Sequence, residues 1–492
     1  MINIQDIKFS AMKNIVKSGI LVALIFCLTI GIEAQEDRYV YHLNVSIDIG
    51  AIENLEVYFV VEDEKEEPNA LMYVPAQFIY EMPAHVIRNS EDSTVIYIKR
   101  LGAEFIGFWD HTIDSYVGMW KQGNQDFPAV STQIRTSEMS FIERPQTPQP
   151  PYQYIQKDIC IENKKGDCKL CGTLTIPDTL NSYPLAILIT GSGAQDRNEE
   201  IAGHQPFKVI ADHLTRNGIA VFRYDDRGFG ESTGNIMKST TYDFMTDAAA
   251  VIDYFGNYPN INDDGIGVIG HSEGGMIAWM LGAKYKKNLA FIVSLAGPVV
   301  DIKDLMIQQS IDVSAASGIE DEKLEVLKNM QTEVFDAAID SKDQSELRRN
   351  IQDIYDKYAV YFDEEEQTEY RLNQQGVNIA VSQLSSDWFK YFLKFQPSKY
   401  IKKIKSPILA MNGTLDIQVD AEQNLDALSK MINSNKCYNL EIHKMNGLNH
   451  LFQNAEEGTV EEYYYLNESF SQEALDIITE FIIRFTKNEK DK

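Results

Sequence analysis

The chain has 492 residues, and at about 150 residues per domain this length suggests about three domains. With 44% hydrophobic residues, the chain can form a large buried core. A formal net charge of −28 argues against a nucleic acid or an anionic membrane surface as a partner, because their phosphates would be repelled. We therefore expect a globular protein with an acidic, well-solvated surface and no nucleic-acid partner.

The first segment has the pattern of a secretory signal peptide. Basic residues precede the apolar run 19–32, and Ala34 supplies a small residue before a cleavage point, so we predict a signal peptide over 1–34. The alternative is an uncleaved signal that stays in the membrane, and it is the one membrane association that the sequence allows. It is weaker because the apolar run is short for a membrane span. We expect an exported protein, periplasmic or extracellular. Whether the natural start is Met12 is left open.

The next segment predicts a small all-β domain. Residues 36–145 alternate short strand-like runs with turn residues and contain no long amphipathic helix. The clearest predicted strands are 40–49, 56–61, 93–98 and 103–109. Prolines at 148, 150 and 151 stiffen the chain after them, so we place a linker at 146–154.

Residues 155–490 have a different texture, in which apolar runs alternate with amphipathic helical segments. The predicted strands are 185–190, 219–224, 266–270, 291–296, 408–412 and 438–443, and the predicted helices are 206–217, 242–255, 276–287, 421–432 and 473–485. This alternation predicts an α/β fold, a mostly parallel sheet flanked by helices. Between about 299 and 397 the sequence is charged and strandless, which predicts an inserted helical cap.

The cysteines allow two interpretations. Cys168 and Cys171 have CxxC spacing, but one such pair without a second pair or histidines is weak evidence for zinc, and we expect no metal. Cys160 lies across the turn 163–167 from this pair. In an oxidising compartment a disulfide across the hairpin would form there; free buried thiols are the alternative.

The most informative motif is the run of residues 270–275, GHSEGG, between an apolar stretch and a helical segment. It has the GxSxG pattern of a nucleophile elbow in its strand–turn–helix context. A serine at so sharp a turn is strained and needs neighbours without Cβ atoms, which Gly270 and Gly274 provide. Ser272 is therefore the predicted nucleophile.

A serine hydroxyl needs an adjacent base, and His450 is the best of the eight histidines. It lies in a loop between the last predicted strand and the last predicted helix. His271 is excluded, because adjacent strand residues point to opposite faces and its ring cannot fold back onto Ser272.

The base in turn needs an acid, and the chain order serine, acid, histidine selects Asp416 just after the strand 408–412. Its neighbours Asp420 and Glu422 are the substitutes.

Backbone N–H groups must meet the charge on the tetrahedral oxygen. We predict the N–H of Glu273, which follows the nucleophile, and that of Ser192 in the glycine-containing loop after the strand 185–190, with Gly193 as its substitute. The stretch 223–232, RYDDRGFGES, contains an acidic pair that argues against a phosphate loop. We interpret Arg227 and the aspartates as a structural ion-pair turn, with a direct role toward substrate as the alternative.

Five stretches in the expected order now resemble the α/β-hydrolase superfamily, and more closely the exported bacterial serine carboxylesterases with an N-terminal β domain, the EstD-like esterases. They are GSGAQDR from Gly191, RYDDRGFGES from Arg223, GHSEGG from Gly270, NGTLDIQV from Asn412 and GLNHLF from Gly447. The resemblance covers about residues 155–490. It implies the α/β-hydrolase fold and acyl transfer to water by serine, aspartate and histidine without a cofactor.

Two parts of the chain depart from this resemblance. Thr190 stands where many relatives have a histidine before the oxyanion glycine, which changes the hydrogen bonding of the loop. The β domain is similar only loosely, chiefly through residues 118–123, and its purpose does not follow from the sequence.

The leading hypothesis is a serine hydrolase acting on a small-molecule ester with a short to medium acyl group. A peptidase or thioesterase using the same triad is one alternative. A peptidase would need a group that binds the substrate amine, and the acidic run 364–366 is a poor candidate for that group. A non-catalytic carbohydrate- or protein-binding protein is the other. Cap aromatics (Tyr355, Tyr358, Trp388, Phe389 and Phe392) either line a pocket or pack the core. The natural ester and the oligomeric state are left open.

Overall fold

The computed structural model describes residues 39–49, 52–61, 70–74, 79–90, 92–123, 125–135, 144–285, 289–316, 318–433, 439–464 and 466–486. The predicted signal peptide, 1–34, lies outside these residues. The described residues fall into two compact units, one within Ile32–Glu143 and the other from Arg144 onward. Within these ranges no helix is both long and apolar enough to span a bilayer.

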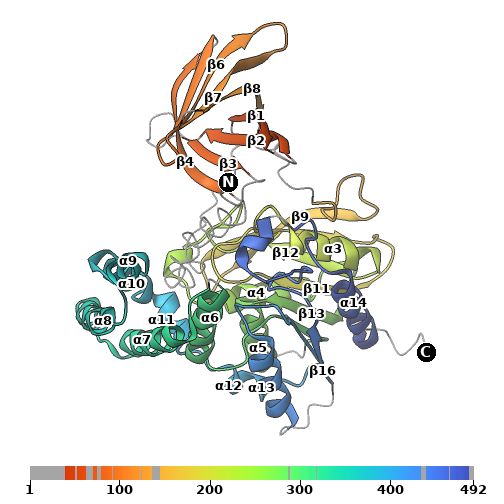
Figure 1. Ribbon diagram of the computed structural model, residues 1–492. Helices are drawn as coiled ribbons and strands as arrows, with labels where there is room; N and C mark the ends of the chain where they lie inside the picture. Colours follow the sequence, from red (N-terminus) through yellow and green to blue (C-terminus); the bar gives the residue numbers. More distant parts are fainter. Residues whose placement is uncertain are drawn as a thin grey trace. The chain divides into compact units, whose positions relative to one another are not determined.

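The first unit is a closed barrel of eight strands, drawn in orange tones in Figure 1. The strands are β1 (Tyr39–Ile49), β2 (Ile52–Val61), β3 (Ala70–Val74), β4 (Ile79–Ser90), β5 (Ser93–Ile98), β6 (Ala103–Asp110), β7 (Ser115–Gln122) and β8 (Gln125–Arg135). Each pairs antiparallel with the next, and β8 closes the barrel on β1. Alternate side chains such as Phe59, Phe105 and Trp120 fill its own apolar core.

The second unit is built on an eight-stranded mixed sheet. Its strands are β9 (Ile155–Asn163), β10 (Cys168–Ile176), β11 (Tyr183–Ile189), β12 (Ala220–Tyr224), β13 (Ile261–His271), β14 (Ile292–Leu295), β15 (Ile408–Gly413) and β16 (Leu440–Met445). They lie in the order β16-β15-β14-β13-β11-β12-β10-β9. The six strands from β11 onward are parallel, whereas β10 pairs antiparallel with both β9 and β12. β9 and β10 were not among the predicted strands, although the cysteine spacing indicated a hairpin at the turn 163–167.

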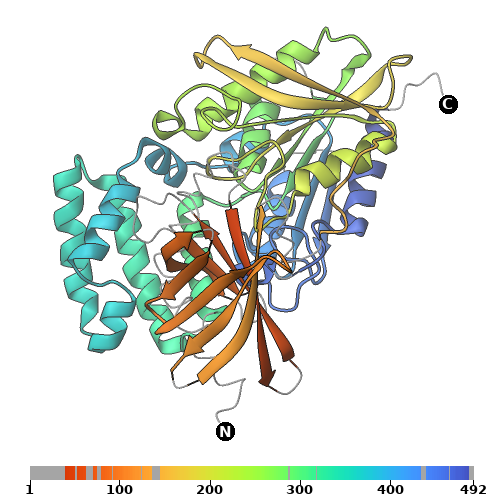
Figure 2. The same cartoon turned by 90° about the horizontal axis from the view of Figure 1, so that it is seen from above.

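Helices cover both faces of this sheet. They are α3 (Pro206–Arg216), η3 (Ile236–Lys238), α4 (Thr241–Phe255), α5 (Glu273–Lys284), α13 (Ala421–Asn433), η4 (Val460–Tyr464) and α14 (Gln472–Thr486). The chain moves from β11 toward β9 through α3, but from β13 toward β16 through α5. Because both crossovers are right-handed, α3 and α5 lie on opposite faces; α14 packs with α3, and α4 packs with α5 (Figures 1 and 2).

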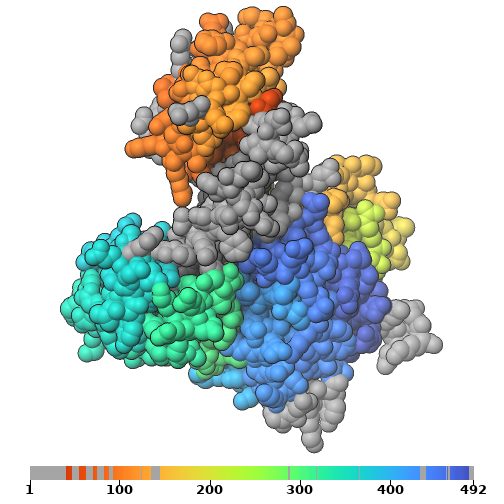
Figure 3. Space-filling model, in the orientation of Figure 1, coloured from red at the N-terminus to blue at the C-terminus, as the bar shows by residue number. Residues whose placement is uncertain are grey.

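The interval between β14 and β15 is a helical cap, as the charged, strandless sequence predicts. It contains α6 (Ile302–Ala316), α7 (Asp321–Asp340), α8 (Gln344–Ala359), α9 (Glu364–Glu369), α10 (Gln374–Leu384), α11 (Asp387–Leu393) and α12 (Ser398–Ile401). Figure 3 shows the green and teal part of this interval as one lobe beside the blue C-terminal segments of the same unit, whereas α12 packs with α5.

The topology itself locates a site. From β11 the chain turns toward one edge of the sheet and from β13 toward the other, so the switch point lies between these two neighbouring strands. Loops that leave the carboxyl ends of strands at a switch point diverge and form a crevice where ligands bind. The loop after β11 holds the predicted donor Ser192, and the turn after β13 holds the predicted nucleophile Ser272.

Candidate active site

Ser272 occupies a strained turn between β13 and α5. Its backbone angles, φ 51° and ψ −117°, lie in a region that side chains rarely adopt. A Cβ at Gly270 would lie 2.1 Å from the oxygen of Gly274, and one at Gly274 would lie 2.1 Å from the oxygen of Ile189. Both glycines of the motif are therefore required by close backbone approach, and they fix the serine at the end of the strand.

His450 and Asp416 form a buried acid–base pair. His450 Nδ1 lies 2.8 Å from Asp416 Oδ2, and the other carboxylate oxygen accepts the N–H groups of Gln418 and Val419 at 2.8 and 2.9 Å. Since an ionised carboxylate only accepts hydrogen bonds, the hydrogen of His450 resides on Nδ1. Nε2 then keeps the lone pair that a general base needs.

Adjacent parallel strands bring this acid and base together. β15 and β16 pair so that Gly413 lies opposite Met445 at their carboxyl ends, and the two loops leave the sheet side by side. Leu415 N–H donates to Leu448 O at 3.0 Å. A Cβ at Gly413 would lie 2.0 Å from that same oxygen, so only glycine allows the loops to approach so closely.

The loop of His450 reaches the nucleophile turn through its backbone. His271, which precedes the nucleophile, places its Nε2 3.0 Å from the carbonyl oxygen of His450, and the two ring centroids are 4.7 Å apart. In the described part of the chain no hydrogen bond joins Ser272 Oγ to His450. Such bonds commonly form or shorten only when substrate is bound.

The two backbone N–H groups that are predicted to bind the oxyanion have no hydrogen-bond acceptor among the described residues. Neither the N–H of Ser192 nor that of Glu273 donates a hydrogen bond within the residues that the structure covers. Glu273 is the first residue of α5, whose leading N–H groups have no partner inside the helix. A Cβ at Gly191 would lie 3.3 Å from that of Ser272, so the loop after β11 packs directly on the nucleophile turn.

The Glu273 side chain connects the nucleophile turn to the cap. Its Oε1 accepts a hydrogen bond from Thr241 Oγ1 at 2.6 Å and one from the Trp388 indole Nε1 at 3.0 Å. Burial raises the pKa of Glu273, and these donors offset part of the rise. Trp388 lies on α11, so a cap helix directly contacts a residue whose backbone is a predicted oxyanion donor.

The turn 223–232 is structural, with one difference from the prediction. Arg227 pairs not with its neighbouring aspartates but with Asp247 of α4, at 2.6 Å between Nε and Oδ2, and both side chains are buried. Asp226 accepts a hydrogen bond from Thr190 Oγ1 at 2.8 Å. Thr190 thus gives the loop after β11 a fixed attachment to this turn.

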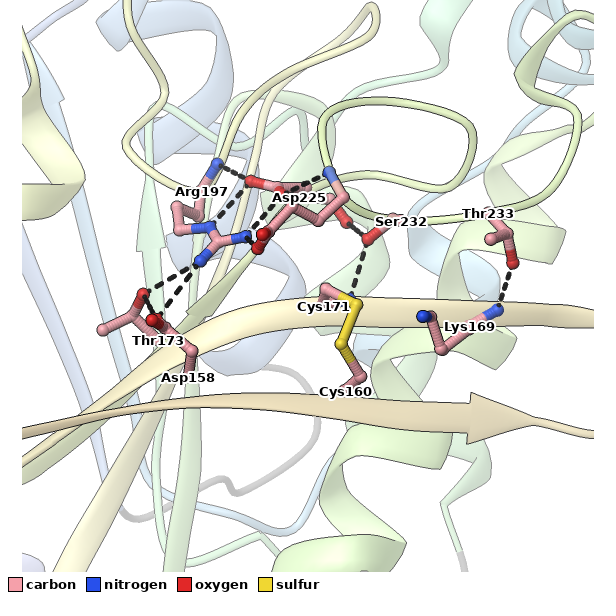
Figure 4. The surroundings of a disulfide bond; sticks show 10 residues. Asp158, Cys160, Lys169, Cys171, Thr173, Arg197, Asp225, Ser232 and Thr233 are labelled. Atoms are coloured by element: carbon pink, nitrogen blue, oxygen red, sulfur yellow. Dashed lines mark hydrogen bonds and ion pairs between the residues drawn. A yellow bond between two sulfur atoms is a disulfide. The ribbon is translucent and has the colours of Figure 1, made fainter. Parts of the chain in front are cut away.

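The hairpin β9–β10 carries a disulfide. Cys160 and Cys171 lie opposite each other in register and are joined (Figure 4). Ser232 Oγ accepts the N–H of Cys171 at 2.8 Å and donates to the backbone oxygen of Asp225 at 2.7 Å. The Asp225 carboxylate in turn binds Arg197 of the loop after β11, at 2.6 Å from Nη2. The hairpin, the turn after β12 and that loop form one connected network.

Cys168 is a buried free thiol. Its Sγ lies 3.2 Å from Asp247 Oδ1, and burial together with this carboxylate raises the pKa of Cys168 to about 12, which makes the thiol unreactive. Among the described residues no group of three histidine, cysteine or acidic side chains could hold a metal ion.

The cap aromatics singled out in the sequence are all buried in packing contacts. Trp388 stacks on Phe392 with ring centroids 4.8 Å apart, and the Tyr358 hydroxyl donates to Glu333. Trp388 also donates a hydrogen bond to the side chain of a predicted site residue, Glu273. Of the acidic run 364–366, Glu366 forms an ion pair with Lys323 on the neighbouring helix α7.

Sequence reasoning missed Glu199 and the interaction of Trp388 with Glu273. Glu199 lies in the loop after β11 with a positive φ of 52°, and it accepts hydrogen bonds from the Gly191 N–H and from His271. No local pattern marks it, because its partners come from distant parts of the chain. The available signal is the histidine before Ser272, which the strand geometry excludes as the base but not as a hydrogen-bonding partner.

Comparison with known proteins gives a consistent picture. A family model described as serine aminopeptidase, S33, matches residues 204–456, about half of the chain. The curated protein Esterase EstD of Thermotoga maritima is 26% identical over 182 residues, which is 37% of this chain and only 42% of that protein. Together with the barrel and the mixed sheet, the family match confirms the predicted α/β-hydrolase fold with an N-terminal all-β domain.

Solved structures that are similar to parts of the chain include an esterase of Pyrococcus furiosus, 16% identical, with a TM-score of 0.41 and coverage of 70% of this chain and 98% of that chain. A proline iminopeptidase of Mycobacterium smegmatis is 13% identical, with a TM-score of 0.40 and coverage of 67% and 99%.

Proposed function

The chain belongs to the hydrolase family described as serine aminopeptidase, S33, and from this membership we propose that it is a serine hydrolase that cleaves carboxylic esters with short to medium acyl groups. The buried pair of His450 and Asp416, 2.8 Å apart on loops that adjoin the strained Ser272 turn, is the observation that carries the proposal. The similarity of part of the chain to Esterase EstD favours an ester as substrate.

The chemistry follows from the roles of these groups. Ser272 Oγ attacks the ester carbonyl carbon while its proton moves to His450 Nε2, and Asp416 stabilises the imidazolium. The N–H groups of Ser192 and Glu273 bind the oxygen that becomes negative. His450 then protonates the leaving alcohol and an acyl-enzyme remains on Ser272. Water activated by the same histidine releases the acid and restores the serine, without a cofactor.

A panel of nitrophenyl esters from acetate to laurate tests the proposal on the purified chain. We expect turnover by the wild type, none above background by Ser272→Ala, and wild-type turnover by Ser345→Ala, an exposed serine of the cap helix α8. Undiminished ester hydrolysis by Ser272→Ala would contradict the assignment of the nucleophile.

The second candidate function is peptide or thioester hydrolysis by the same residues. The description of the family favours it, but Glu366, part of the candidate group for binding a substrate amine, is engaged with Lys323. Aminoacyl amides, acyl thioesters and acyl esters of matched acyl groups separate the candidates. Faster turnover of the amides would replace the esterase proposal by a peptidase.

We also propose that the protein is exported to the periplasm or the medium. The sequence pattern of residues 1–34 and the disulfide between Cys160 and Cys171 support this location, because disulfides persist in oxidising compartments. N-terminal sequencing of the protein recovered from fractionated cells tests it, with a mature start close to Gln35 expected. Recovery of an uncleaved chain from the cytoplasm would contradict it.

A further inference from the structure

A second histidine–carboxylate pair lies beside the one that includes His450. His271 Nδ1 is 3.0 Å from Glu199 Oε1, and the side chains of both residues are almost completely buried. The proposed acyl transfer uses neither of them. Removing two ionisable groups from water is costly, and only close pairing together with further hydrogen bonds offsets that cost.

The carboxylate of Glu199 holds the loop that carries the predicted donor Ser192. Glu199 Oε1 accepts the N–H of Gly191 at 2.7 Å, in addition to its contact with His271. Gly191 directly precedes Ser192, and a Cβ there would be 3.4 Å from that same oxygen. The position of the donor N–H therefore depends on where the Glu199 carboxylate lies.

The other side of the imidazole holds the loop of the predicted base. His271 Nε2 lies 3.0 Å from the backbone oxygen of His450, and a carbonyl can only accept, so Nε2 carries a hydrogen. The contact with Glu199 needs a second hydrogen between Nδ1 and Oε1. The pair thus holds one extra proton, consistent with the pKa of His271, which burial alone would lower but which Glu199 and the hydrogen bonds raise.

We propose that Glu199 and His271 are positioning residues that hold the oxyanion loop and the loop of His450 at a fixed separation across the nucleophile. The inference rests on the proposed function, because it assigns these residues to the same reaction. Three features place the pair in this role: it bonds the residue before one donor N–H, it bonds the backbone of the base, and His271 itself precedes Ser272.

Misplacement of a reacting group by about 1 Å can cost about 100-fold in rate. His271→Phe keeps a ring in the space and removes both hydrogen bonds. We expect it to lower kcat for a nitrophenyl ester by about 100-fold with KM little changed, and to slow fluorophosphonate labelling of Ser272 by a similar factor. Glu199→Gln keeps the shape of the side chain but removes the charge that holds the second proton. We therefore expect its decrease in kcat and in labelling rate to be smaller than that of His271→Phe.

His204 offers a matched control within the same unit. It is completely buried, and its Nδ1 lies 2.9 Å from Ser469 Oγ and its Nε2 2.8 Å from the backbone oxygen of Tyr463. Neither of these partners is a predicted site residue. His204→Phe also removes two hydrogen bonds of a buried imidazole. We expect it to lower the unfolding temperature while kcat and the labelling rate stay at wild-type values.

The outcomes are distinguishable. If folded His271→Phe and Glu199→Gln proteins keep the wild-type kcat and labelling rate, the positioning role is overturned; if His271→Phe does not fold, Glu199→Gln decides. An equal rate loss in His204→Phe also overturns it, because the effect would then be general loosening. If the wild type hydrolyses no ester, the proposed function fails and the labelling rates alone decide this inference. A wild-type Ser272 that does not label overturns both.

Discussion

Ser272 tolerates its backbone conformation because the residues around it leave room for the chain to pass closely. The space that a Cβ at Gly274 would need is already taken by the backbone oxygen of Ile189, the last residue of β11. The absence of a Cβ at Gly274 thus lets the turn of Ser272 lie against the strand that leads into the loop of Ser192.

Gly274→Ala tests this close approach. The new Cβ would be 2.1 Å from the Ile189 oxygen, so the turn must move, and we expect a loss of about 1–3 kcal/mol in the free energy of unfolding together with a large drop in kcat. Gly256→Ala should change little, because its φ is −59°, the nearest atom to the new Cβ is a side-chain oxygen of Asp263 at 3.0 Å, and the nearby backbone oxygens lie at 3.6 Å or more. Chemical unfolding and ester kinetics measure both, and equal behaviour of the two variants would refute the argument.

Asp416→Asn tests the tautomer of the base. An amide can donate to Nδ1 and so favours the hydrogen on Nε2, where the lone pair is needed; we expect kcat to fall by about four orders of magnitude with the fold intact. Asp420→Asn is the matched control, since Asp420 accepts the N–H of Gln423 at the start of α13. Steady-state kinetics compare them. A severe loss in Asp420→Asn, with Asp416→Asn active, would reassign the acid.

At the scale of elements, a buried histidine joins two loops on the α3 side of the sheet. His204, just before α3, bonds Tyr463 in η4 and Ser469 before α14. Burial, assisted by the nearby positive charge of Arg144, lowers the pKa of His204 to about 4. The folded protein therefore holds this imidazole neutral at a pH where the unfolded chain would protonate it.

This difference predicts a pH dependence of stability. The unfolded chain protonates this histidine below pH 6.5, whereas the folded protein does so only near pH 4. The contribution of His204 to the free energy of unfolding is therefore complete above pH 6.5 and decreases, by up to about 3 kcal/mol, as the pH drops toward 4. Urea unfolding at pH 7 and pH 5 should show a larger decrease for the wild type than for His204→Gln. Parallel decreases in the two proteins would show that other groups cause the pH dependence.

The elements that could be predicted from the sequence are those with a strong period or a continuous apolar run. The helices α3, α4, α13 and α14 agree closely with the predicted ranges, because each has an apolar face of helical spacing. In the barrel, the four predicted strands correspond to β1, β2, β5 and β6, whereas β3, β4, β7 and β8 were not among them. Two of these four, β4 and β8, contain a proline, Pro83 or Pro128, which normally argues against a strand. β9 was missed because most of its side chains are exposed and its alternation is weak.

The site divides in the same way. Ser272 follows from a local motif, and Asp416 and His450 follow from chain order, since loops at the ends of parallel strands lie on one edge of the sheet. Glu199 and Trp388 could not be predicted, because their roles depend on contacts made only after the loops and the cap have packed.

At the scale of the whole molecule, the barrel and the unit from Arg144 onward have separate cores. We expect two transitions in calorimetry. The disulfide closes a loop of 11 residues in the second unit only, and its loop-closure entropy corresponds to about 3 kcal/mol. The double variant Cys160→Ser, Cys171→Ser should therefore lower one transition and leave the other in place.

Reduction of the wild type with a thiol is the matched treatment, because it opens the same bond without a substitution. It should lower the same transition by a similar amount. A single transition that moves as a whole in either case would show that the two cores unfold together.

The contact between Trp388 and Glu273 gives the protein an intrinsic fluorescence signal for the position of the cap. The chain has four tryptophans, and in the second unit Trp279 is buried in the core while Trp388 donates to the carboxylate of Glu273, whose backbone N–H is a predicted oxyanion donor. If the cap moved away from Glu273, water would replace the indole as the hydrogen-bond donor to that carboxylate. The fluorescence emission of Trp388 would then change. Substrate entry could then be followed by intrinsic fluorescence, without a label.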